Sequence, residues 1–224
     1  MPTRKEYVVY TTVMCAIAMT IIDGVVQPSY AIKSAIKVFL FLVMPLGYFA
    51  MFRAWGQLKS LFFPRKRDLL IALALGFGAF GLIIGGYALI SRFFDLDTAI
   101  LQLTSDGGVG PENFIYVSTY IALVNSMLEE FFFRGFAFIS MKKLSSRRFA
   151  YVFSAGLFAI YHFGMVAGGG NPLIWIGAMV GLFAAGLILN ALNERSGSII
   201  TSWLLHMCAN LAINTVGFYV FGML

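Results

Sequence analysis

The sequence predicts an all-α fold, a polytopic integral membrane helix bundle with about seven transmembrane helices. Hydrophobic residues make up 60% of the 224 residues and charged residues only 12%, and the mean hydropathy is +0.85. Soluble domains are closer to half apolar and a quarter charged. The apolar residues also fall into separate runs of about 20 residues, the length that a helix needs to cross a bilayer.

Each apolar run is interpreted as one transmembrane helix. The first follows Arg4 and Lys5, as a signal peptide would, but no small-residue cleavage site precedes "DGVVQP", so we interpret it as an uncleaved span. The last run contains Gly217 and Gly222 and is compatible with one helix or two. The runs lie near residues 7–26, 35–52, 69–91, 115–140, 149–165, 172–191 and 198–221.

Charges in the connections predict the orientation. Basic residues gather after the second and fourth runs, whereas the connection after the third run holds four acidic residues and one arginine. Because cytoplasmic connections carry an excess of lysine and arginine, the N-terminus is expected in the cytoplasm. The expected location is the cell (plasma) membrane. Lys33 and Lys37, at the start of the second run, do not fit this rule. The two basic clusters are Arg53, Lys59, Arg65, Lys66 and Arg67, and Lys142, Lys143, Arg147 and Arg148.

The composition also excludes some functions. The net charge of +6 comes largely from these clusters, which set topology, so no nucleic-acid partner is expected. The lipid bilayer is the expected surrounding. Cys15 and Cys208 both lie in apolar runs, which predicts small buried side chains rather than a disulfide framework.

Three ionisable residues interrupt the fourth run, in the stretch "NSMLEEFFFRGFAF" (residues 125–138). A charge at the centre of a span costs roughly 2.5–3.5 kcal/mol, so Glu129, Glu130 and Arg134 would together cost about 8–10 kcal/mol if unpaired. The five neighbouring phenylalanines return only about 2–3 kcal/mol. The three charges must therefore face the bundle interior or a wet cavity.

Helical spacing separates the two glutamates. Glu130 and Arg134 are four residues apart and share a helix face, in the favourable order for an ion pair. Glu129 projects about 100° away, beside Asn125 and Phe133, so it has no cationic partner in its own helix. Because a buried carboxylate of this kind suits a general base, we assign the chemical role to Glu129 and a structural role to Glu130. The alternative is a packing network that only orients helices.

The chain has two histidines, His162 and His206, and both lie inside apolar runs, in "FAIYH" and "HMCAN". Asn210 follows His206 by one helical turn and faces the same side. Counted from the nearest cytoplasmic charges, Glu130, His162 and His206 lie roughly 18, 21 and 16 Å deep. This common depth on three helices favours a single buried site, although a lone intramembrane histidine usually bonds a neighbouring helix.

Taken in order, "EEFFFR" (EExxxR), "FAIYH" (FxxxH) and "HMCAN" (HxxxN) resemble the CPBP family, which covers CAAX prenyl endopeptidases and bacteriocin-processing or immunity proteins. The resemblance covers about residues 115–215. It divides the chain into residues 1–112, N-terminal transmembrane helices with no motif, and residues 113–224, a CPBP-like catalytic helix bundle. It implies an intramembrane endopeptidase whose partner is a membrane-associated peptide or protein substrate, for which a prenylated CAAX-type peptide is one candidate.

The resemblance also implies a role for each motif residue. Glu129 would be the base that activates the hydrolytic water, and His162 would help to hold and activate that water. His206 and Asn210 would stabilise the oxyanion of the tetrahedral intermediate. The acid–arginine pair of the first motif would keep its helix oriented, and Phe158 would pack near the site.

A metal cofactor is not expected, because the zinc-protease motif HExxH is absent. Zinc bound by Glu129, His162 and His206, with one open position, remains the alternative. The family resemblance does not decide between them, since its members carry both glutamate-type and metallo-type labels.

Two other functions remain open. One is a non-catalytic membrane immunity or scaffold protein of the same family. A transporter is the weaker option, because the sequence shows no inverted repeat. An enzyme needs the Glu129 carboxylate itself, whereas a scaffold would tolerate Glu129→Gln.

Overall fold

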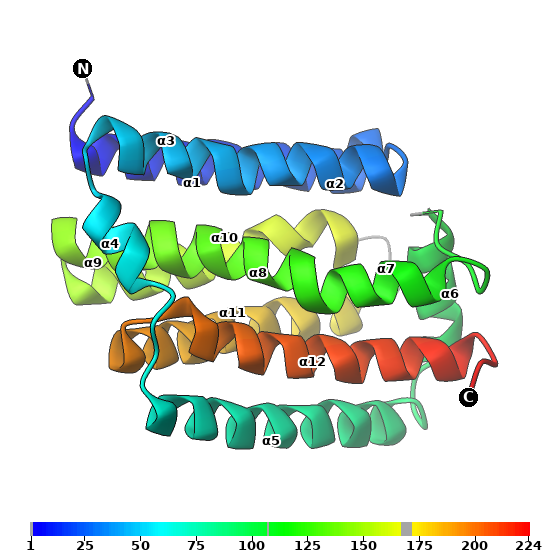
Figure 1. Cartoon of the computed structure of the whole chain (residues 1–224). Coiled ribbons are helices and arrows are strands. Elements are labelled where there is room, and N and C mark those ends of the chain that lie inside the picture. Colours follow the sequence, from blue (N-terminus) through cyan, green and yellow to red (C-terminus); the bar gives the residue numbers. More distant parts are fainter. Residues whose placement is uncertain (1, 107, 167–171) are drawn as a thin grey trace.

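The computed structural model describes residues 2–106, 108–166 and 172–224, and these residues form helices and no strand. The long helices lie side by side and roughly parallel (Figure 1). Among the described residues, six helices are long and apolar enough to cross a membrane. The chain is therefore an all-α, polytopic integral membrane protein. The six are Arg4–Val26, Tyr30–Met51, Lys66–Ile90, Arg147–Val166, Pro172–Ser196 and Ile199–Val220.

The first two of these helices contain π-helical segments, which are labelled η. The first is α1 (Arg4–Ile21) with η1 (Ile22–Val26), and the second is α2 (Tyr30–Val38), η2 (Phe39–Val43) and α3 (Met44–Met51). The others are α5 (Lys66–Ile90), α10 (Arg147–Val166), α11 (Pro172–Ser196) and α12 (Ile199–Val220), with α4 (Trp55–Ser60) and α6 (Leu96–Asp106) in connections.

The remaining expected span is the helix that carries the charged triplet. It runs without a break through α7 (Phe114–Tyr120), η3 (Ile121–Asn125), α8 (Ser126–Glu129), η4 (Glu130–Phe138) and α9 (Ile139–Leu144). It lies within the bundle alongside the apolar helices (Figure 1). This helix contains three charged residues in its middle and is not one of the six apolar helices. The described residues therefore form six apolar helices and one long helix with buried charges.

Two helices extend beyond the apolar runs into polar residues. The second begins at Tyr30 rather than near residue 35 and so includes Lys33. Helix α11 continues to Ser196 rather than ending near residue 191. The last run forms a single helix, α12. Residues 167–171, in the uncharged connection "GMVAGGGNP", lie outside the described residues.

The π-helical segment η4 forms the centre of the core. All nine of its residues are buried, including the phenylalanines that surround the charges. The rings of Phe41 and Phe132 stack with centroids 4.1 Å apart, and Phe133 meets Phe158 edge to face. Wide π-helical turns occur frequently at functional sites. The phenylalanine-rich stretch therefore packs helix against helix around the buried charges.

Side-chain hydrogen bonds join α12 to the helix that carries the charged triplet. In each bond an amide or indole N–H of α12 donates to a backbone carbonyl between residues 118 and 123. Interhelical polar bonds of this kind fix the relative position of membrane helices. The bonds run from Trp203 to Leu123 (3.1 Å), from Asn210 to Ile121 (3.2 Å) and from Asn214 to Ser118 (2.9 Å).

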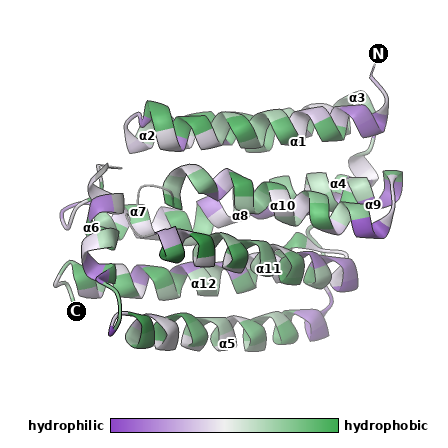
Figure 2. Ribbon diagram, turned by 180° about the vertical axis from the view of Figure 1, so that it is seen from behind, coloured by the Kyte–Doolittle hydropathy of each residue, from purple (hydrophilic) through white to green (hydrophobic). Residues whose placement is uncertain are grey.

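Polar residues gather at the ends of the bundle, and green apolar helices fill the space between (Figure 2). The end that holds the N-terminus also holds α4, α9 and the start of α5 (Figure 1). Both basic clusters therefore lie at the same end. There Glu194 accepts from Arg147 at 2.7 Å and pairs with Lys142 at 3.4 Å.

Helices from both halves of the sequence pack on one another. Helix α5 lies along α12, and α1 lies along α10. The contact between η1 and α10 is close, since Gly24 and Gly164 face each other and a Cβ added at Gly164 would lie 2.9 Å from the Gly24 nitrogen. Small residues permit this backbone approach. Because Gly164 is two residues from His162, the contact also supports the site described below. The division at residue 112 stays a prediction.

The close approach predicts that Gly164→Ala destabilises the protein by about 1–3 kcal/mol, because the added methyl group overpacks the contact between α1 and α10. Thermal unfolding in detergent measures the effect. Gly156→Ala on the same helix is the matched control, since a Cβ there has nothing within 4 Å. It should be neutral or stabilising, because alanine favours helix. Equal destabilisation by both changes would contradict the close approach.

Candidate active site

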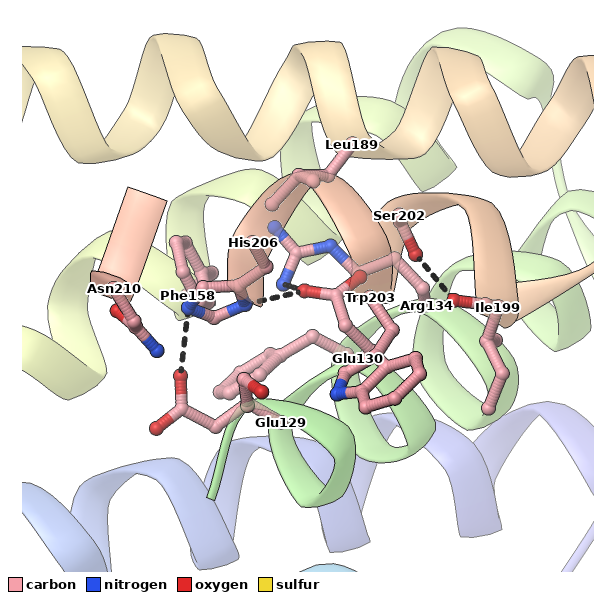
Figure 3. Close-up of polar contacts among 12 residues, drawn as sticks. Glu129, Glu130, Arg134, Phe158, Leu189, Ile199, Ser202, Trp203, His206 and Asn210 are labelled. Carbon is pink, nitrogen blue, oxygen red and sulfur yellow. Dashed lines mark hydrogen bonds and ion pairs between the residues drawn. The ribbon is translucent and has the colours of Figure 1, made fainter. Parts of the chain in front are cut away.

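The structure brings three of the expected site residues together from three helices. His162 Nε2 on α10 lies 3.7 Å from Glu129 Oε2 at the end of α8, and His206 Nε2 on α12 lies 3.9 Å from the same oxygen. Figure 3 shows His206 between Glu129 and Glu130. The Glu129 side chain is only 2% exposed, and that of His162 is 14% exposed. The common depth along three helices thus corresponds to one cluster of side chains.

The two oxygens of Glu129 have different surroundings. Oε1 accepts hydrogen bonds from Asn125 Nδ2 at 2.7 Å and from the Tyr161 hydroxyl at 3.0 Å. Lys37 Nζ lies 3.5 Å from this oxygen. Oε2 is buried and has no hydrogen-bond partner among the described residues. The carboxylate is therefore held through Oε1, while Oε2 faces both imidazole rings.

Lys37 is a site residue that the motifs do not indicate. It comes from α2, and its side chain is 8% exposed. Its misfit to the charge rule has a structural reason, because it contacts a buried carboxylate instead of marking a cytoplasmic connection. Lys33 is similar, since its Nζ lies 3.1 Å from Asp23 Oδ1. Glu129 has no cationic partner in its own helix, as the spacing predicts, but α2 supplies one.

Glu130 contacts both Arg134 and His206. Arg134 Nη1 lies 3.2 Å from Glu130 Oε1, so the ion pair expected from the spacing is present. His206 Nδ1 lies 2.8 Å from the same oxygen. Since an ionised carboxylate only accepts hydrogen bonds, Nδ1 is the donor. Glu130 therefore orients the His206 ring as well as pairing with Arg134.

The His162 ring is oriented through its own helix. Its Nδ1 lies 2.7 Å from the Phe158 carbonyl oxygen, and a carbonyl only accepts, so Nδ1 carries the proton. In the neutral ring, Nε2 is then an acceptor that faces Glu129. The Phe158 ring contributes separately, because the Arg134 guanidinium lies 4.1 Å from its centroid. Such a contact stabilises a buried cation.

Asn210 lies one turn after His206 on α12 (Figure 3). Its Nδ2 donates to the Ile121 carbonyl at 3.2 Å. An amide nitrogen carries two hydrogens, so one remains for another acceptor. Within the described part of the chain, no hydrogen bond joins Asn210 to Glu129 or to either histidine.

The buried charges balance. Glu129 and Glu130 supply two negative charges, and Lys37 and Arg134 supply two positive ones. Each carboxylate has its own cation, within 3.5 Å for Glu129 and 3.2 Å for Glu130. Pairing of this kind offsets the cost of placing charges inside a membrane. With neutral imidazoles, the cluster has no net charge.

The zinc alternative would use Glu129, His162 and His206. Both free Nε2 atoms point toward Glu129, and each Nδ1 has a fixed partner, as metal-binding histidines usually do. However, no three histidine, cysteine, aspartate or glutamate side chains in the described ranges are grouped closely enough to hold a metal ion. The Lys37 ammonium beside Glu129 would also repel a divalent cation. This ammonium is the feature that disfavours zinc, and the absence of a metal cofactor stays a prediction.

Residues 111–212 match the family model for type II CAAX prenyl endopeptidases, Rce1-like. This range holds all three motifs, and it leaves out α1, α2 and therefore Lys37. No curated protein and no solved structure matches the chain significantly.

The buried ion pair of Glu130 and Arg134 leads to a prediction for stability. Arg134→Met should destabilise the protein by about 3–5 kcal/mol, because Glu130 would remain buried without its cation. The exposed Arg148→Met is the control and should stay within about 0.5 kcal/mol of the wild type. Unfolding in detergent reports both. Adding Glu130→Gln to Arg134→Met should recover part of the loss. If Arg134→Met were as mild as the control, the pair would not stabilise the bundle.

Proposed function

Because the chain belongs to the CPBP/CAAX protease family, on a match over residues 111–212, we propose that it is an intramembrane endopeptidase acting on a membrane-associated peptide or protein. The family match indicates a protease of the CAAX type in general. One observation supports the mechanism proposed here. Glu129 Oε2 has no hydrogen-bond donor among the described residues and lies within 3.9 Å of two imidazole nitrogens, while Oε1 is held by its neighbours.

Glu129 is the general base in this proposal. A water between Glu129 Oε2 and His162 Nε2 would donate one hydrogen to each, which leaves its oxygen lone pair free to attack. A base must lie within hydrogen-bond reach of the proton that it removes. His162 is the more exposed of the two side chains, at 14%, so the scissile carbonyl would approach from its side.

Attack of the water oxygen on the carbonyl carbon forms the new C–O bond and moves the π electrons onto the carbonyl oxygen. One water proton passes to Glu129 Oε2. Collapse of the tetrahedral intermediate breaks the C–N bond, and the departing nitrogen takes the proton from Glu129. The products are a carboxylic acid and an amine, and Glu129 returns to its ionised form.

His206 and the free Asn210 N–H are the proposed oxyanion donors. For His206 to donate from Nε2, its ring must carry protons on both nitrogens, since Glu130 uses the hydrogen on Nδ1. Each hydrogen-bond donor aimed at the developing oxyanion commonly contributes about 10²–10³-fold to the rate. This mechanism uses no metal ion. The Lys37 ammonium beside Glu129 favours a metal-free mechanism, because it would repel a divalent cation.

The proposal predicts cleavage of a membrane-associated peptide by the protein in liposomes, measured first with a fluorogenic prenylated CAAX peptide beside its unprenylated form. Glu129→Gln should abolish cleavage, because the amide cannot accept the proton. Asn210→Ala should keep residual activity, lower by about 10²–10³-fold. A zinc chelator should leave the rate unchanged.

The controls separate the alternatives. Every variant is assayed at a temperature at which it is folded, so that lost activity reflects lost chemistry. Inhibition by the chelator, reversed by zinc, would replace the metal-free mechanism with a zinc mechanism. Full biological function in Glu129→Gln would instead support the immunity or scaffold protein.

We propose that the protein lies in the plasma membrane. The basic clusters at one end of the bundle support a cytoplasmic N-terminus. In a protein with Cys15 and Cys208 replaced by alanine, a cysteine at Thr98 should react with an impermeant maleimide in intact cells. A cysteine at Lys59 should react only after the membrane is opened. The reverse pattern would invert the orientation.

A further inference from the structure

We propose that Lys37 is a positioning residue of the peptidase site, the counter-ion that holds the Glu129 carboxylate in place as a base. The inference rests on the proposed function for its catalytic part. Its structural part, the pairing of Lys37 with Glu129, stands on the contacts alone.

Burying the Lys37 ammonium within a membrane helix costs free energy, which indicates that this residue has a function in the site. It lies seven residues into the helix that begins at Tyr30, or about 10 Å along its axis. A lysine at such a depth costs roughly 2.5–3.5 kcal/mol on insertion scales and usually marks a functional site. Its side chain is only 8% exposed, so most of it is buried in the bundle.

Three groups surround the ammonium: Glu129 and the two residues that donate hydrogen bonds to it, Asn125 and Tyr161. Lys37 Nζ donates to Asn125 Oδ1 at 2.6 Å and lies 3.5 Å from Glu129 Oε1. It also lies 5.0 Å from the centroid of the Tyr161 ring, a cation–π distance. An ammonium has three hydrogens and no acceptor, so this arrangement can occupy each hydrogen.

Lys37 also fixes the direction of the Asn125 amide. Because lysine only donates, the amide oxygen must face Lys37, and the amide nitrogen then faces Glu129. Asn125 Nδ2 donates to Glu129 Oε1 at 2.7 Å in that orientation. Lys37 thus acts on Glu129 directly by charge and indirectly through Asn125. Both effects hold Oε1, which leaves Oε2 turned toward the histidines.

The same helix offers a matched control. Lys33 lies one turn before Lys37, is also largely buried and pairs with Asp23 at 3.1 Å. No hydrogen bond or ion pair in the described part of the chain joins Lys33 to Glu129. A purely structural role for buried lysines in α2 would make the two positions behave alike, whereas a role at Glu129 would separate them.

The first test is a stability cycle in detergent, which needs no substrate. Lys37→Met should lower the unfolding temperature by about 10 °C, because Glu129 then stays buried without a cation. In the Glu129→Gln background the same change should lower it little or not at all, because there it removes an unpaired ammonium. Lys33→Met should act equally in both backgrounds. Equal effects of Lys37→Met in both backgrounds would overturn the pairing.

The second test is kinetic, with the peptide that the wild type cleaves, at a temperature where every variant is folded. Lys37→Met should lower kcat by about 10²-fold, the lower limit for loss of a working general base, with KM within about twofold. Lys37→Arg, which keeps the charge, should retain more of kcat than Lys37→Met. Lys33→Met should leave kcat unchanged.

An unchanged kcat in Lys37→Met, or equal losses in Lys37→Met and Lys33→Met, would overturn the positioning role. If the wild type cleaves no peptide, the proposed function fails, and with it the catalytic part of this inference. The stability cycle would still decide whether Lys37 is the counter-ion of Glu129. The two failures are therefore distinguishable.

Discussion

The burial of four charges in the interior of a membrane helix bundle is the constraint on which the rest of this structure depends. All four side chains are buried, and an unpaired charge inside a membrane bundle is expensive; they are Glu129, Glu130, Arg134 and Lys37. The pairing of Lys37 with Glu129 requires that α2 pack against the helix of the charged triplet with these two residues at the same level along the bundle. The stacked phenylalanines of η4 and the hydrogen bonds from α12 to the carbonyls near Ile121 hold that arrangement in place.

Two adjacent glutamates have different environments because their partners differ. Glu130 shares one oxygen between Arg134 and His206, so it joins an ion pair to an imidazole. Glu129 has one oxygen held and one without a donor among the described residues. In many enzymes two neighbouring carboxylates have different roles because their surroundings differ. The division here follows from helix geometry, since adjacent residues point to different neighbours.

The family match begins at residue 111, yet the site extends beyond it. Helix α2 contributes Lys37, and the close contact of Gly24 with Gly164 places η1 beside the helix that carries His162. The N-terminal helices therefore belong to the electrostatics and packing of the site. In a membrane, small residues and polar contacts determine such packing, because lipid offers apolar side chains little reason to prefer one helix over another.

The sequence by itself determined the fold class, the approximate spans and the Glu130–Arg134 pair, because apolar run length and four-residue spacing are local properties of a helix. It also indicated a common depth for Glu130, His162 and His206. Only the tertiary structure decided that Lys37 and Tyr161 contact Glu129, and that Glu130 orients His206. These contacts depend on how distant helices are rotated about their axes, which spacing within one helix does not specify. The misfit of Lys37 to the charge rule was the one sequence signal that pointed to it.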